Sequence, residues 1–223
     1  MQLVATRTTA RLQRHRSRPI IGRVPENASL NDATVVLDDR TVLRGISLEL
    51  APGLTLLRGT NGAGKTTLLR AFAGLVPLAR SRRNIPGGQP LYIGHRPMLL
   101  RGLTARENLS FLAAFRGLVA SDVGEALRRW GLGDEMDRPI ERLSAGQRRR
   151  ASLARIETEP VPLVLLDEPF ADLDTDALVR LRAALNTALV RGQAVLMATH
   201  MHHELDQDAV HRYVIDDGAL RET

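Results

Sequence analysis

A glycine-rich segment with a single lysine is the clearest candidate for chemistry in the sequence. It consists of Gly59-Thr60-Asn61-Gly62-Ala63-Gly64-Lys65-Thr66-Thr67 and lies between an apolar stretch and an expected helix. Glycines let backbone N–H groups turn towards phosphate oxygens, and the positive end of a following helix adds to the attraction. The Lys65 ammonium is predicted to reach the β- and γ-phosphates of a nucleotide, and the Thr66 hydroxyl to bind Mg²⁺. The pattern therefore predicts a P-loop.

Two carboxylates end an apolar stretch about 100 residues after the P-loop. Residues Leu163–Leu166 lead directly into Asp167 and Glu168. Asp167 is predicted to hold Mg²⁺, directly or through water, and Glu168 to polarise a water that attacks a phosphate. Acidic residues at the end of a strand are common by themselves, so this interpretation depends on the P-loop upstream.

A second anion site is predicted at the start of a helix, at Leu143-Ser144-Ala145-Gly146-Gln147. Ser144 and the N-terminal amides of the helix suit a phosphate, although Ser144 is equally suited to be the N-cap of that helix. The next residues, Arg148-Arg149-Arg150, are interpreted as a solvated arginine cluster. Because the P-loop already binds its own phosphates, the second site must find a phosphate elsewhere.

The elements that position these motifs alternate between strands and helices. Apolar stretches flanked by turn residues predict strands at Ala33–Leu37, Ile46–Leu50, Leu54–Arg58, Leu91–Ile93, Leu163–Asp167, Ala194–Thr199 and Tyr213–Asp216. Helical patterns cover Lys65–Leu75, Thr104–Arg116, Val123–Trp130, Ala145 to about Glu157, and Asp176–Val190, with a capping box at Thr104 and Glu107. The alternation predicts an α/β fold with a mainly parallel core sheet, interrupted by a helical insert of about 50 residues.

The order of the motifs resembles the ATPase subunit of an ABC transporter, over roughly residues 30–218. The P-loop, the serine-containing signature and the acidic strand are followed by Asp172-Leu173-Asp174 and, after the strand Ala194–Thr199, by His200. The resemblance implies a P-loop NTPase fold of the ABC type, with an N-terminal β subdomain and a helical subdomain at about 96–150. We therefore expect a basic extension at residues 1–28, an ATPase domain at 29–218 and a C-terminal tail at 219–223.

The same resemblance implies roles in the hydrolysis of ATP with Mg²⁺. It implies a head-to-tail dimer, in which ATP on the P-loop of one subunit is also bound by the signature of the other, through Ser144, Gly146 and Gln147. Glu168 is then the general base and His200 contacts the γ-phosphate. Asp174 belongs to the dimer contact.

Three departures from the common family pattern narrow the resemblance. Leu37 stands where an adenine-stacking aromatic is usual, so base binding must rest on apolar contact or on an arginine plane such as Arg40 or Arg44. His95 stands where a glutamine usually reaches Mg²⁺. Because an imidazole is a poorer ligand for this hard cation than an amide oxygen, we expect His95 to act through water or mainly in coupling, and the alternative is a surface loop histidine. Ala145 replaces the first glycine of the signature. With the short chain, these features resemble the haem-exporter ATPase of cytochrome c maturation.

Composition excludes several classes and isolates the N-terminus. The chain has 223 residues and no cysteine, which excludes a disulfide scaffold, a thiol nucleophile and Cys-ligated metals. Six arginines and no acid in the first 25 residues account for the net charge of +6, since the remainder has 25 basic and 25 acidic residues. This extension is either a mitochondrial transit peptide, a disordered segment or the result of a start codon assigned too far upstream. Lys65 is the only lysine of the chain.

The leading functional hypothesis is an ATPase that powers export by a separate ABC-type membrane subunit. The aliphatic stretches of this chain are too short to cross a bilayer. We therefore expect the chain to associate peripherally, through the membrane subunit, with the cytoplasmic face of the inner or cell membrane. The matrix side of the mitochondrial inner membrane is the alternative if the extension is a transit peptide. Other functional alternatives are another small-molecule exporter, a soluble ABC ATPase acting on nucleic acid, and a nucleotide switch with little turnover. No direct binding of nucleic acid is expected, because the aromatic residues are few and scattered.

Overall fold

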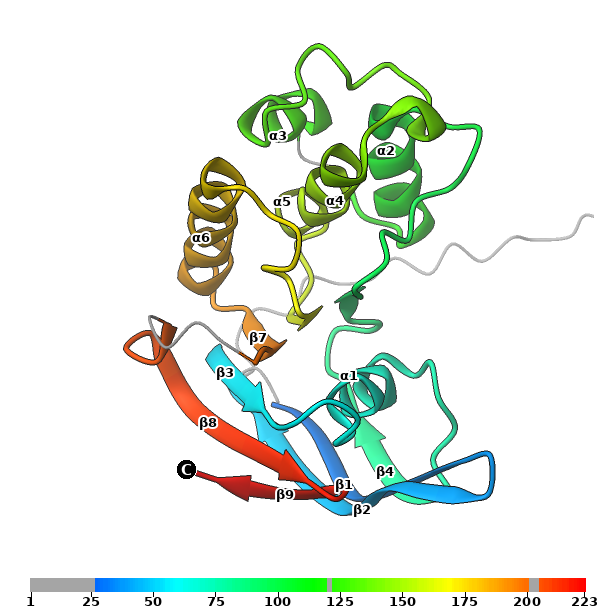
Figure 1. Cartoon of the computed structure of the whole chain (residues 1–223), viewed down its shortest axis with the longest axis vertical. Helices are drawn as coiled ribbons and strands as arrows, with labels where there is room; N and C mark the ends of the chain where they lie inside the picture. Colours follow the sequence, from blue (N-terminus) through cyan, green and yellow to red (C-terminus); the bar gives the residue numbers. More distant parts are fainter. Residues whose placement is uncertain (1–26, 120–121, 201–204) are drawn as a thin grey trace, which may run out of the picture.

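Parallel strands form the centre of the molecule, and the glycine-rich loop follows one of them (Figure 1). The computed structural model describes residues 27–119, 122–200 and 205–223. In chain order the elements are β1 (Ala28–Leu37), β2 (Arg40–Leu50), β3 (Gly53–Arg58), α1 (Lys65–Ala73), β4 (Arg80–Asn84), β5 (Leu91–Ile93), α2 (Ala105–Phe115), α3 (Val123–Arg129), the 3₁₀ turn η1 (Ile140–Arg142), α4 (Ala145–Leu153), α5 (Arg155–Thr158), β6 (Leu163–Asp167), α6 (Thr175–Val190), β7 (Ala194–Ala198), β8 (Ala209–Asp216) and β9 (Ala219–Glu222).

The core sheet has six strands in the order β5-β6-β7-β3-β8-β9, and it is parallel except for the β8–β9 hairpin. Every residue of β6 and β7 is buried, as expected for parallel strands that are covered on both faces. Ala198 of β7 pairs with both Leu57 of β3 and Asp167 of β6. The carboxyl ends of these three strands therefore lie side by side, and the predicted mainly parallel sheet is confirmed.

Alternate residues of the core strands point into two different hydrophobic cores. One core joins the sheet to the helices α2–α6 and includes Leu56, Ile93, Leu166 and Met197. The other joins the sheet to α1 and to the antiparallel sheet β2-β1-β4, and it includes Leu57, Tyr92, Leu165 and Leu196. The antiparallel sheet is the expected N-terminal β subdomain (Figure 1). The strands of the core sheet are therefore fixed from both sides, which gives rigid positions to the loops at their ends.

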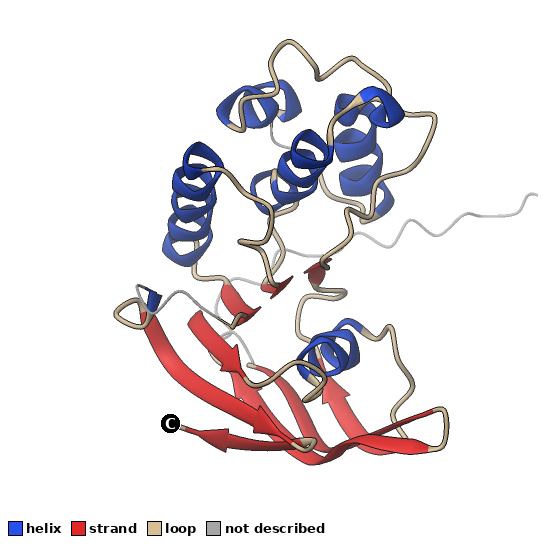
Figure 2. Cartoon of the chain, viewed as in Figure 1, coloured by secondary structure: helices blue, strands red, loops and turns tan. Residues whose placement is uncertain are grey.

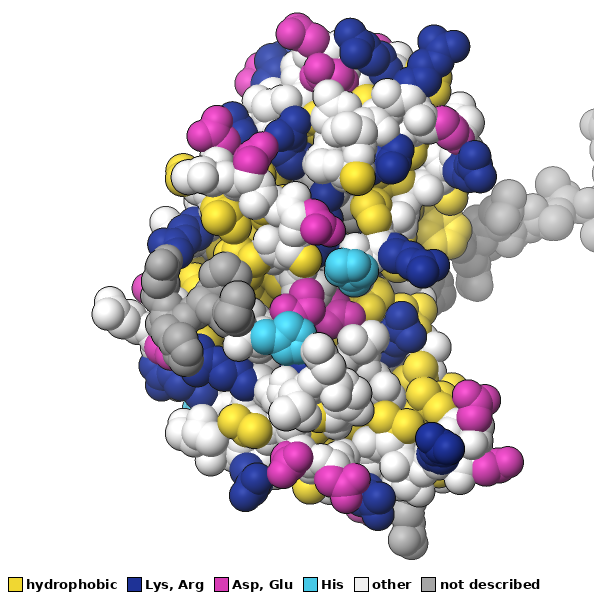
Figure 3. Space-filling model, in the orientation of Figure 1, with side chains coloured by type: hydrophobic (Ala, Val, Ile, Leu, Met, Phe, Trp, Pro, Cys, Tyr) yellow, Lys and Arg dark blue, Asp and Glu magenta, His cyan; other side chains and the backbone are white. Residues whose placement is uncertain are grey.

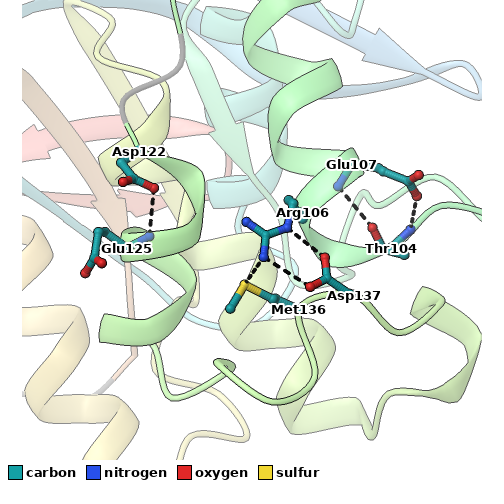
Figure 4. A network of polar contacts seen from close by, with 7 residues as sticks. All are labelled: Thr104, Arg106, Glu107, Asp122, Glu125, Met136 and Asp137. Atoms are coloured by element: carbon teal, nitrogen blue, oxygen red, sulfur yellow. Dashed lines mark hydrogen bonds and ion pairs between the residues drawn. The ribbon is translucent and has the colours of Figure 1, made fainter.

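The helices α2–α5 gather on the side of the core sheet away from β1, β2 and β4 (Figure 2). Thr104 and Glu107 form the predicted capping box of α2, and Asp122 caps α3. Arg106 of α2 donates to Asp137, which lies before η1, at 2.7 Å (Figure 4). These local contacts fix where the helices begin and hold the connecting segments. Among the described residues, no helix combines the length and apolarity needed to cross a membrane.

The structure differs from two of the predicted boundaries and contains one strand that the sequence pattern does not predict. The boundary predicted at 218 falls inside the β8–β9 hairpin, because Asp217 and Gly218, both with positive φ, form its two-residue turn. The helical part continues past 150 to Thr158, since Ala151, Leu153 and Ile156 are buried in its core. Strand β4 was not predicted, because Arg80–Asn84 is polar throughout and pairs at the edge of the antiparallel sheet. The predicted extension at 1–28 lies almost entirely outside the described residues.

A candidate phosphate-binding cleft

A cleft of about 180 Å³ lies at the carboxyl ends of β3, β6 and β7. It is lined by nine residues from the loops that follow these strands and from the start of α1: Asn61, Gly62, Gly64, Lys65, Thr66, Thr67, Asp167, Glu168 and His200. All nine are predicted site residues, brought together by a parallel sheet whose strands end at the same edge. In Figure 3, acidic and histidine side chains gather at the middle of this face, between the upper and lower parts of the molecule.

The glycines of the loop allow a backbone path that other residues would obstruct. Gly59 has φ 147°, and a Cβ atom there would lie 2.3 Å from the carbonyl oxygen of Ile215. Gly64, with φ 111°, precedes α1 and provides no side-chain cap, whereas α2, α4 and α6 each begin with a side-chain cap. The first N–H groups of α1 are therefore left for an external acceptor, which is the requirement for an anion site at a helix N-terminus.

Lys65 lies under the loop and binds the loop's own carbonyls. Its Nζ donates to the carbonyl oxygens of Gly59 and Thr60 at 2.8 and 3.0 Å and lies 3.2 Å from Nδ1 of His200. Burial lowers the pKa of Lys65, and the charges of Glu168 and Asp167 act in the opposite direction. An ammonium held by neutral carbonyls can exchange these hydrogen bonds for bonds to phosphate oxygens.

Thr66 and Asp167 form a pair of oxygen ligands at the base of the cleft. The Thr66 hydroxyl donates to Oδ2 of Asp167 at 2.9 Å, and the hydroxyl of Tyr92 is 3.3 Å from the same oxygen. Hydroxyl and carboxylate oxygens are the donors that Mg²⁺ prefers, and this ion usually completes its shell with water and substrate phosphates. The residues present therefore fit Mg²⁺ bound together with a nucleotide, although the described residues include no cluster of three or more His, Asp or Glu that would hold a metal alone.

Glu168 and His200 face each other across the mouth of the cleft. Oε1 of Glu168 lies 3.0 Å from Nε2 of His200. Burial raises the pKa of Glu168, while His200 and Lys65 lower it. Glu168 has φ 47°, an unfavourable backbone conformation for a residue with a side chain. The arrangement can hold a carboxylate as a proton acceptor close to the predicted position of the γ-phosphate.

The serine-containing signature lies outside this cleft. Ser144 is exposed, and its hydroxyl accepts from the N–H of Gln147 at 3.1 Å, while the Gln147 side chain accepts from the N–H of Ser144 at 2.8 Å. Both predictions for Ser144 are therefore compatible, since a hydroxyl that accepts from the helix keeps its own proton to donate. A Cβ atom at Gly146 would meet no atom of the described residues within 4 Å. Asp174 caps α6 by accepting from the N–H of Ala177 at 2.7 Å.

Two further predictions, for His95 and for the adenine position at Leu37, concern side chains outside the nine residues that line the cleft. His95 follows β5 and is exposed, and its imidazole is not among the groups that line the cleft. Leu37, in the place of the usual adenine-stacking aromatic, is half-buried and packs against the core beneath the antiparallel sheet. Arg40 is exposed, and Arg44 lies 3.8 Å from Asp217. Both arginines are exposed, so either could contact a base only at the surface of the protein.

Sequence reasoning missed two polar residues near the cleft, Tyr92 and Arg149. The sequence pattern places Tyr92 in a strand, and nothing in it indicates that the hydroxyl reaches Asp167. The prediction that Arg149 belongs to a solvated cluster is wrong, because Arg149 is only 4% exposed. Its guanidinium donates to the carbonyl oxygens of Gly94 and Glu168 at 2.5 and 2.9 Å. Its position four residues before the buried Leu153 was the available signal for an inward-facing side chain.

The fold and the cleft together define a nucleotide-binding P-loop protein with a separate signature on a helical subdomain. Residues 43–171 match the family model described as ABC transporter, and the chain belongs to this family. It is an ATP-binding and ATP-hydrolysing subunit of an ABC transporter. The fold is similar to that of a solved ATP-binding subunit of an ABC transporter, with a TM-score of 0.79 and 23% identity over 88% of this chain and 90% of the other. It is also similar to a bacterial Atm1-family ABC exporter with ATP bound, with a TM-score of 0.75 and 20% identity over 92% of this chain and 39% of that one.

Curated relatives are more similar in sequence. The chain is 40% identical over 194 residues to the cytochrome c biogenesis ATP-binding export protein CcmA of Ruegeria pomeroyi, covering 86% of this chain and 92% of the relative. It is 40% identical over 182 residues to the protein of the same name from Methylococcus capsulatus, covering 75% and 87%. The resemblance to the cytochrome c maturation branch is thereby confirmed.

Proposed function

We propose that the cleft binds Mg-ATP on the P-loop and hydrolyses it with Glu168 as the general base. The observation that supports this most directly is the convergence of Lys65, Thr66, Asp167, Glu168 and His200 in one cleft, with the P-loop amides left uncapped. Lys65 exchanges its bonds to the loop carbonyls for bonds to the β- and γ-phosphates. Thr66 and Asp167 hold Mg²⁺, which neutralises charge on the phosphate oxygens when it is bound.

Each side chain then has a defined part in hydrolysis. Glu168 accepts a proton from water while the water oxygen attacks the γ-phosphorus and the bond to the β–γ bridging oxygen breaks, so that ADP leaves. A pKa raised by burial makes Glu168 a stronger proton acceptor than an exposed glutamate. His200, between Glu168 and Lys65 at 3.0 and 3.2 Å, orients the γ-phosphate by a hydrogen bond.

A second subunit completes the site. Ser144 and Gly146 are at a helix N-terminus, do not line the cleft of their own chain, and are accessible. None of the described residues lies within 4 Å of a Cβ placed at Gly146, so none of them requires glycine there, and the open space supports close approach by another molecule. We therefore propose the head-to-tail dimer, with Gln147 holding the capping box of the signature and Asp174 at the dimer contact.

Replacement of Glu168 by Gln tests both proposals. Turnover is expected to fall by about 10²- to 10⁴-fold, the usual contribution of a general base, while ATP binding is retained. Light scattering with saturating Mg-ATP is expected to show an accumulated dimer. Glu125→Gln, at an exposed position of α3, is the matched control and keeps wild-type turnover. A variant that hydrolyses ATP as fast as wild type refutes the general base, and a monomer refutes the composite site.

A groove next to α2 is suited to a membrane subunit. It is lined by residues from the end of α1, from α2 and from β5 with its flanking segments, among them Leu75, Met98, Leu112 and Phe115. Leu75, Met98 and Phe115 are 53%, 52% and 77% exposed, which is unusual for large apolar side chains gathered in one place. Because relatives 40% identical are named export proteins of cytochrome c biogenesis, we propose that this groove docks the membrane subunit of such an exporter, with haem as the cargo class. The chain then associates peripherally with the cytoplasmic face of the membrane.

Rebinding to membranes tests the groove. Purified protein is added to membranes of the source cells from which peripheral proteins have been removed, and bound protein is measured after sedimentation. Phe115→Arg is expected to lower binding at least tenfold, whereas Val190→Arg, at an 81% exposed apolar residue of α6 outside the groove, leaves it unchanged. Equal binding of the two variants refutes the docking surface.

Deletion of the gene tests the cytochrome c branch. Loss of covalently bound haem in c-type cytochromes supports this branch, and normal haem attachment refutes it.

A further inference from the structure

Arg149 is a buried cation with backbone carbonyls as its partners. It lies on α4, is 4% exposed, and has no carboxylate within ion-pair distance among the described residues. Nη1 donates to the carbonyl oxygens of Gly94 at 2.5 Å and His95 at 3.3 Å, and Nη2 donates to that of Glu168 at 2.9 Å. Burial lowers the pKa of Arg149, opposed by the charges of Asp172 and Asp167. A buried charge is costly unless its bonds are well formed, so an apolar residue would fill this place at lower cost if packing were the only requirement.

The partners of Arg149 come from the ends of two neighbouring strands. Gly94 and His95 follow β5, and Glu168 follows β6, with Ile93 and Leu166 paired in register. The guanidinium therefore joins the signature helix to two loops of the core sheet at one point. A planar group with several donors in fixed directions suits this task, because it can bind acceptors on both loops at the same time.

The Glu168 backbone is held in an unfavourable conformation from two sides. Its φ is 47°, its N–H donates to the carbonyl oxygen of Ala198 at 3.0 Å, and its own carbonyl oxygen accepts from Arg149. The N–H of Ala171 approaches the same oxygen at 3.2 Å. A residue with a side chain keeps a left-handed backbone conformation only where surrounding contacts determine it. The direction of the Glu168 carboxylate thus depends on contacts to its main chain.

We propose that Arg149 is a positioning residue that couples the signature helix to the general base of the same subunit. Ser144 is at the N-terminus of the same helix, so that engagement of the partner's ATP by Ser144 acts on Glu168 through one rigid element and one guanidinium. This inference rests on the proposed roles of Glu168 and Ser144. It predicts that replacing Arg149 changes turnover and the dependence of turnover on a second ATP. The binding of ATP to the P-loop of a single subunit is expected to stay unchanged.

The test compares Arg149→Met and Arg149→Lys with Arg148→Met in the full-length protein. Arg148 is on the same helix and half-buried, and it donates to the carbonyl oxygen of Leu143, so it is a matched control. We expect kcat to fall by about 10²-fold in Arg149→Met, as is common when a reacting group is misplaced by about 1 Å. Arg149→Lys keeps the charge but loses the planar set of donors, so its kcat is expected to lie between that of wild type and that of Arg149→Met. The Kd of a fluorescent ATP analogue stays within about threefold of wild type, and cooperativity in ATP is lost.

A double-mutant comparison separates positioning from general stabilisation. If Arg149 acts through Glu168, Arg149→Met lowers the residual turnover of Glu168→Gln by less than threefold, because both changes remove the same contribution. A further 10²-fold loss overturns the inference, as does a wild-type kcat in folded Arg149→Met. If Arg149→Met does not fold, Arg149→Lys decides, and a folded Lys variant with wild-type kcat and cooperativity overturns the inference. Failure of the proposed role of Glu168 is distinguishable, since Glu168→Gln alone would then hydrolyse ATP as fast as wild type, whatever Arg149→Met does.

Discussion

A buried carboxylate between two arginines fixes the helical part to the core sheet, and its removal has a large expected cost. Glu159 is fully buried and accepts from Arg155 at 2.5 and 3.2 Å and from Arg116 at 2.7 Å. Arg116 at the end of α2 also donates to the carbonyl oxygens of Gln89 and Pro90, before β5. Burial lowers the pKa of Arg116, and Glu159 raises it. This carboxylate therefore compensates two cations at the apolar groove, the buried Arg155 and the half-buried Arg116.

Glu159→Gln keeps the shape and removes the charge. Breaking a buried ion pair on one side costs about 3–5 kcal/mol, and no discount for solvent applies because the Glu159 side chain is 0% exposed. For a domain of this size, 1 kcal/mol corresponds to roughly 2–4 °C, so the unfolding midpoint is expected to fall by about 6–20 °C. Since whole domains are stable by about 5–15 kcal/mol, this is a substantial part of the total.

Urea unfolding followed by circular dichroism measures the change in the free energy of unfolding. Glu125→Gln, which breaks a half-exposed ion pair with Arg128, is the control and should change it by less than about 1 kcal/mol. Adding Arg116→Met to Glu159→Gln should recover part of the loss, because one uncompensated cation disappears. A loss below about 1 kcal/mol in Glu159→Gln, or no recovery in the double variant, would show that the cations are not held by this carboxylate.

Two further predictions concern the cleft and the signature. Carbon-13 NMR should place the pKa of Glu168 above about 4.3, the ordinary glutamate value, and His200→Ala should raise it further, since His200 lowers it. Because the folded-state pKa is raised, the free energy of unfolding from this group is greatest below about pH 4.3 and decreases as pH rises through the folded value, and a pKa at or below 4.3 contradicts this. Gly146→Ala should leave the unfolding midpoint equal or slightly higher, because the added Cβ meets none of the residues that the structure describes. The same change should weaken the ATP-dependent dimer of Glu168→Gln in light scattering, and an undisturbed dimer would remove Gly146 from the partner interface.

The sequence was most informative where periodicity and motif spacing agree. Strands β5 and β6 match their predicted bounds, and the nine residues of the cleft were all predicted, because a parallel sheet forces its carboxyl ends to one edge. The sequence pattern does not predict the edge strand β4, since arginine, serine and asparagine supply no apolar side chains whose alternation could indicate a strand. A hydrophobic pattern predicts strands that bury an apolar face. It does not predict a strand that forms through backbone pairing alone.

The same limit explains the missed polar residues. Arg149 and Glu159 are charged and lie in charged or polar neighbourhoods of the sequence, yet both are buried, because their partners are brought in from other elements. Arg148 and Arg150, on either side of Arg149, are half-buried, so composition alone does not distinguish the three. Only the three-dimensional meeting of α4 with the ends of β5 and β6 does so.

The use of arginine everywhere except at one position has a practical chemical consequence. The Lys65 side chain is the single primary amine among all side chains of the chain, it is 6% exposed, and its pKa is lowered by burial. Acylating reagents therefore have two amines to modify, this one and the α-amino group. Occupancy of the cleft becomes readable as the protection of one atom, by mass spectrometry of intact protein, without any engineered label.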